Sequence, residues 1–458
     1  MWNIKTNSKL VKKNDIFICT HDEYLNRHIY IDDALIKKPS AIIIDEEVDK
    51  KIKVPVIRVN DTNDTLFQIA HDYYGKPLEK IKLIGITGTD GKTTTATMVK
   101  DLLSFFTKAA YLGTNGFCYD NVSLNTTNTT PGIAEIIKYA SIALENNCKY
   151  LIMEVSSEGL LHNRCQNLLF DQTILTNVTK DHLNIHKDFN NYLNSKLKLF
   201  DQLRDNGTNV INIDDNSYSL FKKRNNAKTI SYGKNNDAMF RFDNIKEYLG
   251  YTTFDLIVKD DLYHIKSPFC GEFNVYNLVC ALAVISNLGF SLDDVMDKIM
   301  VLKPIKGRMN FIDSRKGFKI VLDYAHTTKA TLEVLTYINK VKTGKIITVV
   351  GCAGDRYKDK REEIGKIVAD YSDIAIFTMD DPRNEKIENI FSDMEKNIRQ
   401  NNVIKIKNRK KAIKKAINLA TNNDILLILG KGTDSYMAVK NKYKKYNDLD
   451  VIKKILSL

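Results

Sequence analysis

Gly88-Thr89-Asp90-Gly91-Lys92-Thr93-Thr94-Thr95 is the stretch that decides the fold of this chain. It follows an apolar run at 82–86 and precedes a helical pattern at 96–103, so a strand, a glycine loop and a helix start come in that order. Such a turn lets the backbone approach a phosphate, and the helix N-terminus offers it free N–H groups. Lys92 would reach the terminal phosphates and Thr93 would bind Mg²⁺, which together predict an ATP site.

The spacing of the two glycines leaves a second interpretation open. Gly88 and Gly91 lie closer together than the glycines of the strict phosphate-loop pattern, and an ordinary strand-turn-helix connection also fits them. The Lys-Thr-Thr after Gly91, with an apolar strand before the loop and a helix after it, favours the phosphate loop.

The composition is that of an ordinary globular protein with an excess of basic residues. Lys and Arg number 68 against 56 Asp and Glu, a net charge of +12. Lysines are scattered along the whole chain. The densest basic run, 405–415, is typical of the solvated face of a helix. The residues available for burial there are Ile404, Ala412, Ile413, Ala416 and Ile417. We therefore expect no nucleic-acid partner.

The cysteines and the N-terminal residues indicate a cytoplasmic protein. The seven cysteines form no C-x-x-C pair, which argues against a zinc ribbon or a redox pair, and free thiols fit a reducing compartment. The N-terminus lacks the apolar core of a signal peptide, and no apolar run approaches the ~20 residues of a membrane helix. We expect no membrane insertion.

Three α/β domains are expected, at 1–80, 81–306 and 307–458. Short apolar runs typical of buried strands occur at 15–19, 41–44, 82–86, 150–153, 172–175, 209–213, 319–322, 346–350, 374–377 and 425–429. A helix is expected at 64–74, and a strand-rich patch at 228–268 predicts an antiparallel addition. The last four strands each end in a polar motif, where doubly wound sheets bind ligands.

Two further motifs follow strands of the expected central domain. Glu154 ends one strand and is placed to bind the metal of a nucleotide, although a capping or surface glutamate has the same pattern. His182 and His186 are four residues apart and would share a helix face. A zinc site there lacks the glutamate of the H-E-x-x-H motif and any nearby cysteine.

The motifs together resemble those of the Mur ligase family, and most closely its tripeptide-forming branch. They occur in the family's order over nearly the whole chain, at 87–94, 128–131, 153–157, 177–182, 273–277, 307–309, 323–326, 380–383 and 430–432. The resemblance implies a three-domain α/β architecture. Its parts are a small N-terminal domain that binds UDP, a central P-loop ATPase-like parallel sheet and a C-terminal Rossmann-like domain that binds an amino acid.

The resemblance also implies residue roles for ATP and metal. The ATP-binding residues would be Gly88, Thr89, Asp90, Gly91, Lys92, Thr93, Thr94, Asn277, Arg308, Asp323 and His326. Mg²⁺ would be held by Thr93, Glu154, His182 and Lys196, the last as a carbamate formed from CO₂. Lys92, Lys196, Glu154 and His182 would be catalytic. ATP would convert a substrate carboxylate into an acyl phosphate, which an amine then attacks.

The implied substrates are UDP-N-acetylmuramoyl-L-alanyl-D-glutamate and a diamino acid, bound by a monomer. The sugar-dipeptide would contact Ser8 at its UDP end and also Asn128, Thr129, Thr130, Ser157 and Arg164. The amino acid would contact Arg361, Asp380, Asp381, Pro382, Arg383, Gly430 and Asp434. A guanidinium pairs well with a carboxylate, so Arg383 favours meso-diaminopimelate over lysine.

Some positions depart from the family pattern, and other functions stay open. Glu158, His162, Thr433 and Asp434 replace the family's usual residues, and 447–450 reads Asn-Asp-Leu-Asp. One alternative is another amide ligase of the superfamily, such as a folylpolyglutamate or cyanophycin synthetase. The other is a catalytically silent paralogue that binds UDP-sugar peptides. The motif at 128–131 argues against the first, and the intact Lys92 and Lys196 argue against the second.

Overall fold

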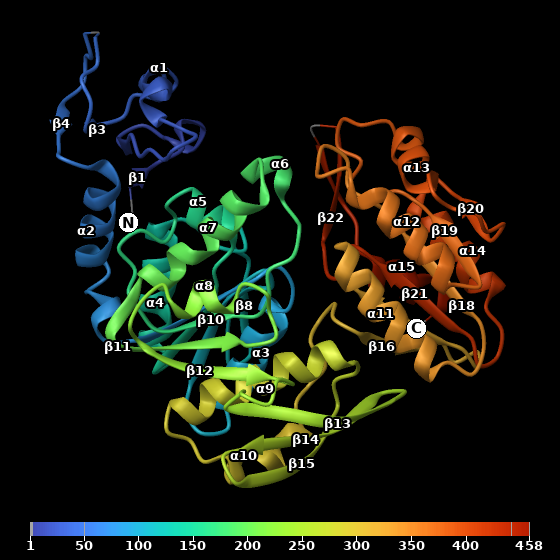
Figure 1. Ribbon diagram of the computed structural model, residues 1–458. Helices are drawn as coiled ribbons and strands as arrows, with labels where there is room; N and C mark the ends of the chain where they lie inside the picture. The colour runs from blue at the N-terminus through green and yellow to red at the C-terminus, as the bar shows by residue number, and fades with distance from the viewer. Residues whose placement is uncertain (1–2, 50, 441, 458) are drawn as a thin grey trace.

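The computed structural model describes residues 3–49, 51–440 and 442–457. Figure 1 shows three sheet-bearing parts that follow one another along the chain. The N-terminal part (blue) and the C-terminal part (orange to red) lie on opposite sides of the central part (green to yellow). The sheets contain 4, 11 and 6 strands, and a two-stranded hairpin is added near the C-terminus. The α/β class implied by the sequence is confirmed.

The N-terminal part is a small parallel sheet in the order β1-β2-β3-β4. Its elements are β1 (Ile4–Lys5), η1 (Ser8–Leu10), β2 (Ile16–Ile18), η2 (Arg27–Tyr30), α1 (Ile31–Leu35), β3 (Ala41–Ile44), β4 (Val56–Arg58), α2 (Thr62–Tyr73) and η3 (Pro77–Glu79). Helix α2 does not cover this sheet alone. Leu66 and Ala70 of α2 are buried in one core with Ile136 and Ile137 of the central part. The domain boundary at residue 80 stays a prediction.

The central part is built on an eleven-stranded sheet in the order β15-β14-β13-β12-β11-β10-β5-β9-β6-β7-β8. Its strands are β5 (Lys82–Thr87), β6 (Ala109–Gly113), β7 (Gly116–Tyr119), β8 (Val122–Leu124), β9 (Tyr150–Glu154), β10 (Phe170–Leu175), β11 (Leu203–Asn212), β12 (Lys228–Gly233), β13 (Phe240–Tyr248), β14 (Tyr251–Val258) and β15 (Asp261–Ser267). Strands from β6 to β12 in this order pair in parallel, and β13, β14 and β15 add the expected antiparallel segment.

Helices cover both faces of this sheet. They are α3 (Lys92–Leu103), α4 (Ile133–Glu145), α5 (Ser157–Leu161), α6 (Leu183–His186), α7 (Phe189–Asp201), α8 (Tyr218–Lys222), α9 (Glu272–Asn287) and α10 (Leu292–Ile299). One core joins α3, α9 and α10, and a second core joins α4 and α7 on the other face. The strand that precedes the glycine loop, β5, lies between β9 and β10, so the loop emerges at the middle of the sheet.

The C-terminal part is a second doubly wound unit in the order β16-β17-β21-β18-β19-β20. Its elements are β16 (Asn310–Asp313), β17 (Lys319–Asp323), α11 (Thr328–Val341), β18 (Ile346–Val350), α12 (Lys360–Tyr371), β19 (Ile374–Phe377), α13 (Ile387–Glu395), β20 (Val403–Lys405), α14 (Arg409–Leu419), β21 (Ile425–Leu429), β22 (Tyr436–Val439), β23 (Lys442–Lys445) and α15 (Asp448–Leu456). Helices α11, α12 and α13 pack on one face, and α14 and α15 on the other.

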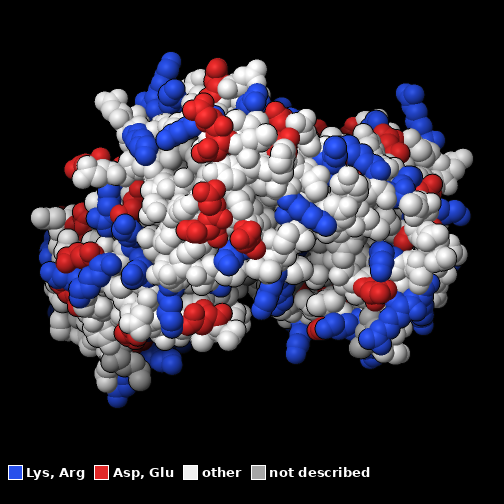
Figure 2. Space-filling model, turned by 90° about the horizontal axis from the view of Figure 1, so that it is seen from below, with Lys and Arg blue, Asp and Glu red and all other residues white. Residues whose placement is uncertain are grey.

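The basic run at 405–415 behaves largely as the sequence predicts. Ala412, Ile413, Ala416 and Ile417 of α14 are buried, whereas Ile404 lies in strand β20 and is only half-buried. On the face shown in Figure 2, basic side chains are interspersed with acidic ones. Within the described residues, no helix combines the length and the apolar character needed to cross a bilayer.

Candidate active site

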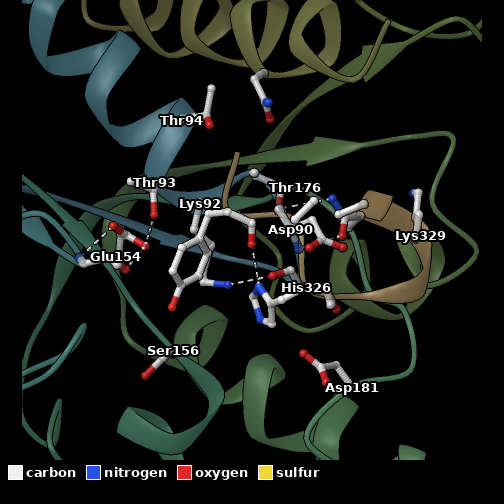
Figure 3. Close-up of a pocket in the computed structure, with 18 of the residues that line it drawn as sticks. Asp90, Lys92, Thr93, Thr94, Glu154, Ser156, Thr176, Asp181, His326 and Lys329 are labelled. Atoms are coloured by element: carbon white, nitrogen blue, oxygen red, sulfur yellow. Dashed lines mark hydrogen bonds between the residues drawn. The ribbon is translucent and has the colours of Figure 1, made fainter. Parts of the chain in front are cut away.

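A cavity of about 650 Å³ lies between the central and C-terminal parts (Figure 3). Many of the residues singled out from the sequence line it: Thr89, Asp90, Gly91, Lys92, Thr93, Thr94, Asn128, Thr129, Glu154, Ser157, Arg164, His182, Lys196, Asn277, Arg308, Asp323 and His326. Segments from both large sheets therefore converge on one space. Gly88, Ser8, Thr130 and the predicted amino-acid contacts are not among its lining residues.

The glycine loop has a backbone that requires its glycines. Gly91 has a φ of 84°, and a Cβ there would lie 2.4 Å from Oδ1 of Asn277. Helix α3 begins directly after it, at Lys92. The Lys92 ammonium donates to the backbone oxygens of Gly88 and Thr89, at 2.8 Å each, and burial lowers its pKa. The loop thus holds a cation and a helix N-terminus at the cavity, which suits a bound phosphate chain.

The carboxylate of Glu154, at the end of β9, accepts several hydrogen bonds. Its carboxylate accepts hydrogen bonds from the Thr93 hydroxyl at 2.9 Å, the Thr114 N–H at 2.9 Å and the Tyr111 hydroxyl. Arg308, from the C-terminal part, places a nitrogen 3.3 Å from the Thr93 hydroxyl. Thr93 and Glu154 are therefore neighbours, joined by a dashed line in Figure 3, and both offer the oxygen ligands that Mg²⁺ prefers.

His182 lies beside this oxygen cluster but not on a helix face with His186. It has a φ of 55° and precedes α6. Its ring nitrogens lie 3.4 Å from Asp181 and 3.6 Å from Glu158, and burial lowers its pKa to about 3, so the ring is neutral. His186 instead lies between the Ser157 and Ser195 hydroxyls, at 3.1 and 3.2 Å. The two histidines do not form the zinc site that their spacing allowed.

Lys196 is a buried lysine on α7 with an unusual environment. Its side chain is 1 % exposed, and its ammonium donates to the backbone oxygen of Gly88 at 2.6 Å and lies 4.4 Å from the ring centre of Tyr192. The same Gly88 oxygen accepts from Lys92. Burial, followed by repulsion from Lys92, holds the pKa of Lys196 well below its usual value. This environment therefore favours the neutral form of the amine.

Residues of the C-terminal part close one side of the cavity. Asp323, at the end of β17, is 6 % exposed and accepts from the N–H groups of Met309 and Ala325 at 2.6 and 2.7 Å. Burial raises its pKa. His326 is directed by Nδ1 toward the backbone oxygen of Tyr324 at 2.9 Å, a contact drawn in Figure 3.

The residues predicted to bind the sugar-dipeptide are only partly together. Thr130 is buried and donates to the backbone oxygen of Glu154 at 2.9 Å, and Arg164 donates to the backbone oxygen of Thr130 at 3.2 Å. The Ser157 hydroxyl instead lies within hydrogen-bond distance of Nε2 of His186. Ser8 lies in η1 of the N-terminal part, away from the cavity.

The three acidic residues among the predicted amino-acid contacts gather around Lys431, a buried residue within the motif at 430–432. Its ammonium lies 3.3, 2.9 and 3.1 Å from carboxylate oxygens of Asp380, Asp381 and Asp434. Burial raises the pKa of Asp434 to about 6, despite the attraction of Lys431. Gly430 has a φ of 105°, and a Cβ there would lie 2.7 Å from Asp380, so this position requires glycine.

The two arginines of this region differ in whether carboxylates hold their guanidinium groups. Arg361 is fully buried, and its guanidinium donates to Glu385 through both NH groups at 2.7 Å and to Asp393 at 3.0 Å. Carboxylates of this chain thus occupy the guanidinium that was expected to bind the amino acid, and that expected contact stays a prediction. Arg383, which follows Pro382, has a φ of 50°. In both arginines Nε is buried without a hydrogen-bond partner among the described residues.

Several residues of the site were missed by the sequence analysis. Asp181 stands within the quoted motif at 177–182 and binds Lys360 of the C-terminal part at 3.2 Å, so its motif was the available signal. Tyr111 and Thr114, which bind Glu154, had none, because they reach it only through the pairing of β6 with β9.

Two family models match this chain. The Mur ligase middle domain matches residues 86–285, and the Mur ligase glutamate ligase domain matches residues 307–432. Together these matches cover most of the central and C-terminal parts.

Full-length relatives carry related names. A UDP-N-acetylmuramoyl-L-alanyl-D-glutamate–2,6-diaminopimelate ligase of Fusobacterium nucleatum is 34% identical over 98% of this chain and 93% of its own length. An enzyme of that name from Clostridium acetobutylicum is 34% identical over 99% and 94%. A UDP-N-acetylmuramyl-tripeptide synthetase of Oceanobacillus iheyensis is 34% identical over 98% and 93%.

Two solved structures have a fold similar to that of this chain. A structure of a UDP-N-acetylmuramoyl-L-alanyl-D-glutamate–2,6-diaminopimelate ligase has a TM-score of 0.67 at 26% identity, covering 100% of this chain and 95% of its own. A MurF ligase of Thermotoga maritima in complex with ADP has a TM-score of 0.68 at 20% identity, covering 99% and 98%. The second shows the fold alone.

Proposed function

The chain belongs to the Mur ligase family of ATP-dependent amide ligases, and on that premise we propose that it joins a diamino acid to UDP-N-acetylmuramoyl-L-alanyl-D-glutamate. The observation that carries the substrate assignment is the full-length similarity to relatives named for this reaction with 2,6-diaminopimelate. The protein would act in the cytoplasm as a monomer, with domains at 1–80, 81–306 and 307–458.

The reaction needs a carboxylate made reactive toward an amine. ATP would transfer its terminal phosphoryl group to the D-glutamate carboxylate, which gives an acyl phosphate and ADP. Bound Mg²⁺ would supply positive charge against the phosphate oxygens and the carboxylate. Lys92 and the N–H groups at the start of α3 bind the phosphate oxygens, where negative charge builds in the transition state. Their positions are fixed before reaction, so little reorganisation is needed. The amine of the diamino acid then forms the amide bond, releases phosphate and loses a proton.

The donor set beside Lys92 supports the proposed metal sites. Thr93 and Glu154 contribute oxygen ligands, and His182 contributes a neutral ring nitrogen, because its pKa is about 3. Arg308 and Asp323 close the nucleotide side from the C-terminal part. Because residues of both large domains line the cavity, a substrate bound there would contact both of them.

We assign Lys196 as the carbamylated lysine. A neutral amine is the form that attacks CO₂: the N–C bond forms, and the amine proton leaves to water. The neutral state is favoured here first because the side chain is buried, which lowers its pKa, and second because Lys92 binds the same Gly88 oxygen. The product is an anion in place of a second cation. It would attract Lys92 and give Mg²⁺ an oxygen ligand.

For the added amino acid we propose meso-diaminopimelate. Arg383 has a buried, unpartnered Nε among the described residues, and a guanidinium fits the distal carboxylate that lysine lacks. Asp434 would face the distal amine. Arg361, whose two terminal nitrogens bind Glu385 and Asp393, would hold the loop rather than the substrate.

Purified protein with ATP, Mg²⁺ and the UDP-sugar dipeptide tests the proposal. ADP release should require both the dipeptide and a diamino acid, and mass spectrometry should identify the diaminopimelate-containing tripeptide. Product with lysine alone would refute the amino-acid assignment and keep the ligase. Activity with a folate or cyanophycin primer would support another superfamily ligase, and binding without turnover would support the silent paralogue.

A further inference from the structure

A second cluster of possible metal ligands lies in the N-terminal part, outside the cavity described above. Within residues 3–49, 51–440 and 442–457, His28, Asp45 and Glu46 form the group whose ligand atoms all lie within 4.8 Å of one another. Asp45 and Glu46 directly follow β3, and His28 lies in η2. His21 adds a second imidazole, with Nε2 at 2.9 Å from Asp45. These residues gather at the carboxyl end of a parallel sheet, where loops commonly form binding sites.

Hydrogen bonds determine how the His28 ring is protonated. The Asn26 amide nitrogen donates to the Glu46 carboxylate at 3.0 and 2.8 Å, so the other atom of this amide is its oxygen. That oxygen accepts from the His28 backbone N–H at 3.0 Å and lies 2.7 Å from His28 Nδ1. Nδ1 must therefore carry the ring proton, and in the neutral ring Nε2 presents a lone pair.

The two oxygens of the Asp45 carboxylate differ in their hydrogen-bond partners. Its Oδ2 accepts from His21 at 2.9 Å and from the Thr62 N–H and hydroxyl at 2.8 and 2.9 Å. Its Oδ1 faces His28 Nε2 at 3.3 Å, and neither atom has a hydrogen-bond partner in the described part of the chain. The two side chains are only 8 % and 4 % exposed. Two buried acceptors facing each other are unfavourable unless a cation lies between them.

We propose that His28 Nε2, Asp45 Oδ1 and a Glu46 carboxylate oxygen bind a divalent transition-metal ion, for which zinc is the best fit. Ligands at about 2.0–2.1 Å from a tetrahedral zinc lie about 3.3–3.4 Å apart, which matches the separation of the first two atoms. The Nδ1–H of His28 donating to Asn26 is the outer contact that metal-bound histidines usually make. Glu46 is 49 % exposed and would give the ion access.

The ion would tie the end of β3 to η2. The fourth ligand position would be filled by water or by a turned His21 ring, which is 35 % exposed. Because binding to the folded form alone stabilises it by mass action, zinc should raise the unfolding temperature of the N-terminal part.

Equilibrium dialysis of the full-length, metal-stripped protein against zinc tests the site. We expect His28→Gln and Asp45→Asn each to bind about one zinc ion per chain fewer than the wild type. The matched control is His264→Gln, which removes an exposed histidine paired with Asp255 at 2.6 Å and should leave zinc binding unchanged. Circular dichroism shows whether each variant folds. If His28→Gln or Asp45→Asn fails to fold, Glu46→Gln is tested in its place, because the Glu46 side chain is exposed. Weakened zinc binding in Glu46→Gln would also support the site.

Histidine NMR separates the metal site from a simple ion pair. The His28 signals are identified by their loss in His28→Gln. Zinc should shift the Nε2 signal and leave Nδ1 protonated. A doubly protonated His28 ring that does not respond to zinc, or His28→Gln and Asp45→Asn variants that bind as much zinc as the wild type, would overturn the proposal.

Discussion

Replacing Lys196 by alanine tests the proposed catalytic role of a buried lysine. The Lys196 and Lys92 ammonium groups donate to one backbone oxygen, at 2.6 and 2.8 Å, so their nitrogens are close neighbours. Two unit charges at about 4–5 Å repel by about 3–4 kcal/mol at an effective dielectric constant of about 20. A neutral Lys196 avoids this repulsion, and a carbamate converts it into attraction. The alanine variant loses the carbamate but keeps Lys92 in place.

We expect Lys196→Ala to fold and to lose about 10²–10³ in kcat, because one preorganised group that stabilises transition-state charge is worth about 3–4 kcal/mol. The matched control is Lys198→Ala, two residues along the same helix, where the side chain is exposed. Its kcat should stay near that of the wild type. Small carboxylates should partly restore the Lys196→Ala variant, since they can enter the space and supply the missing anionic ligand.

The assay is ADP release with the tripeptide product quantified by mass. Wild-type protein in CO₂-depleted buffer should lose activity and regain it with bicarbonate, and isotope-labelled CO₂ should give a carbamate NMR signal absent from the variant. Turnover of Lys196→Ala within a few-fold of the wild type would refute the reasoning. So would full wild-type activity with no carbamate signal at any CO₂ concentration.

Four other outcomes follow from the site. Lys92→Ala should fold normally and lose about 10²–10³ in product formation, since a clamp on phosphoryl charge is removed; near-normal turnover would contradict the ATP assignment. Arg383→Ala should lower kcat/KM for diaminopimelate, with a loss of about 2–5 kcal/mol in transition-state binding, the usual cost of removing one partner of a buried charge pair. An unchanged kcat/KM would contradict the proposed contact with the distal carboxylate. Because the pKa of Asp434 is about 6, this carboxyl gains a proton as pH falls through 6, and KM for the diamino acid should rise there; Asp434→Asn should abolish that inflection. Arg361 lowers the pKa of Glu385 to about 2, below its ordinary 4.5, so the stability from this pair is present above pH 4.5 and is lost as pH falls toward 2. In denaturant titrations, Glu385→Gln should therefore cost about 2–3 kcal/mol at pH 7 and little at pH 2; equal losses at both pH values would contradict this.

The fold was predictable where local patterns settle it. Buried parallel strands appear in the sequence as short apolar runs, and β3, β9, β18 and β21 lie where those runs are. The phosphate loop was predictable because its glycines are required by backbone geometry, as the contact at Gly91 shows. Such features depend on residues that are close together in the chain.

The features of the fold and the site that the sequence did not predict depend on contacts between distant segments, which leave no local pattern. Tyr111 reaches Glu154 only because β6 pairs with β9, and Lys360 reaches Asp181 only because the C-terminal sheet lies across the cavity. The packing of α2 into the central core is of the same kind. The family resemblance implied that Arg361 contacts the amino acid, but its guanidinium binds Glu385, which lies 24 residues away, and nothing local pairs the two.

The amino-acid region has a charge balance that matches one kind of ligand. Lys431 is a single cation facing three carboxyl groups, those of Asp380, Asp381 and Asp434, and this arrangement favours a substrate ammonium group. Arg361 cannot leave its carboxylates cheaply, because breaking a buried ion pair costs about 3–5 kcal/mol. Within the described part of the chain, Arg361 is engaged by two carboxylates and Arg383 by none, so Arg383 is the guanidinium that a substrate carboxylate would pair with. A ligand that suits both features carries an extra ammonium and an extra carboxylate. Diaminopimelate has both, whereas lysine has only the ammonium and would leave the Arg383 charge unpaired.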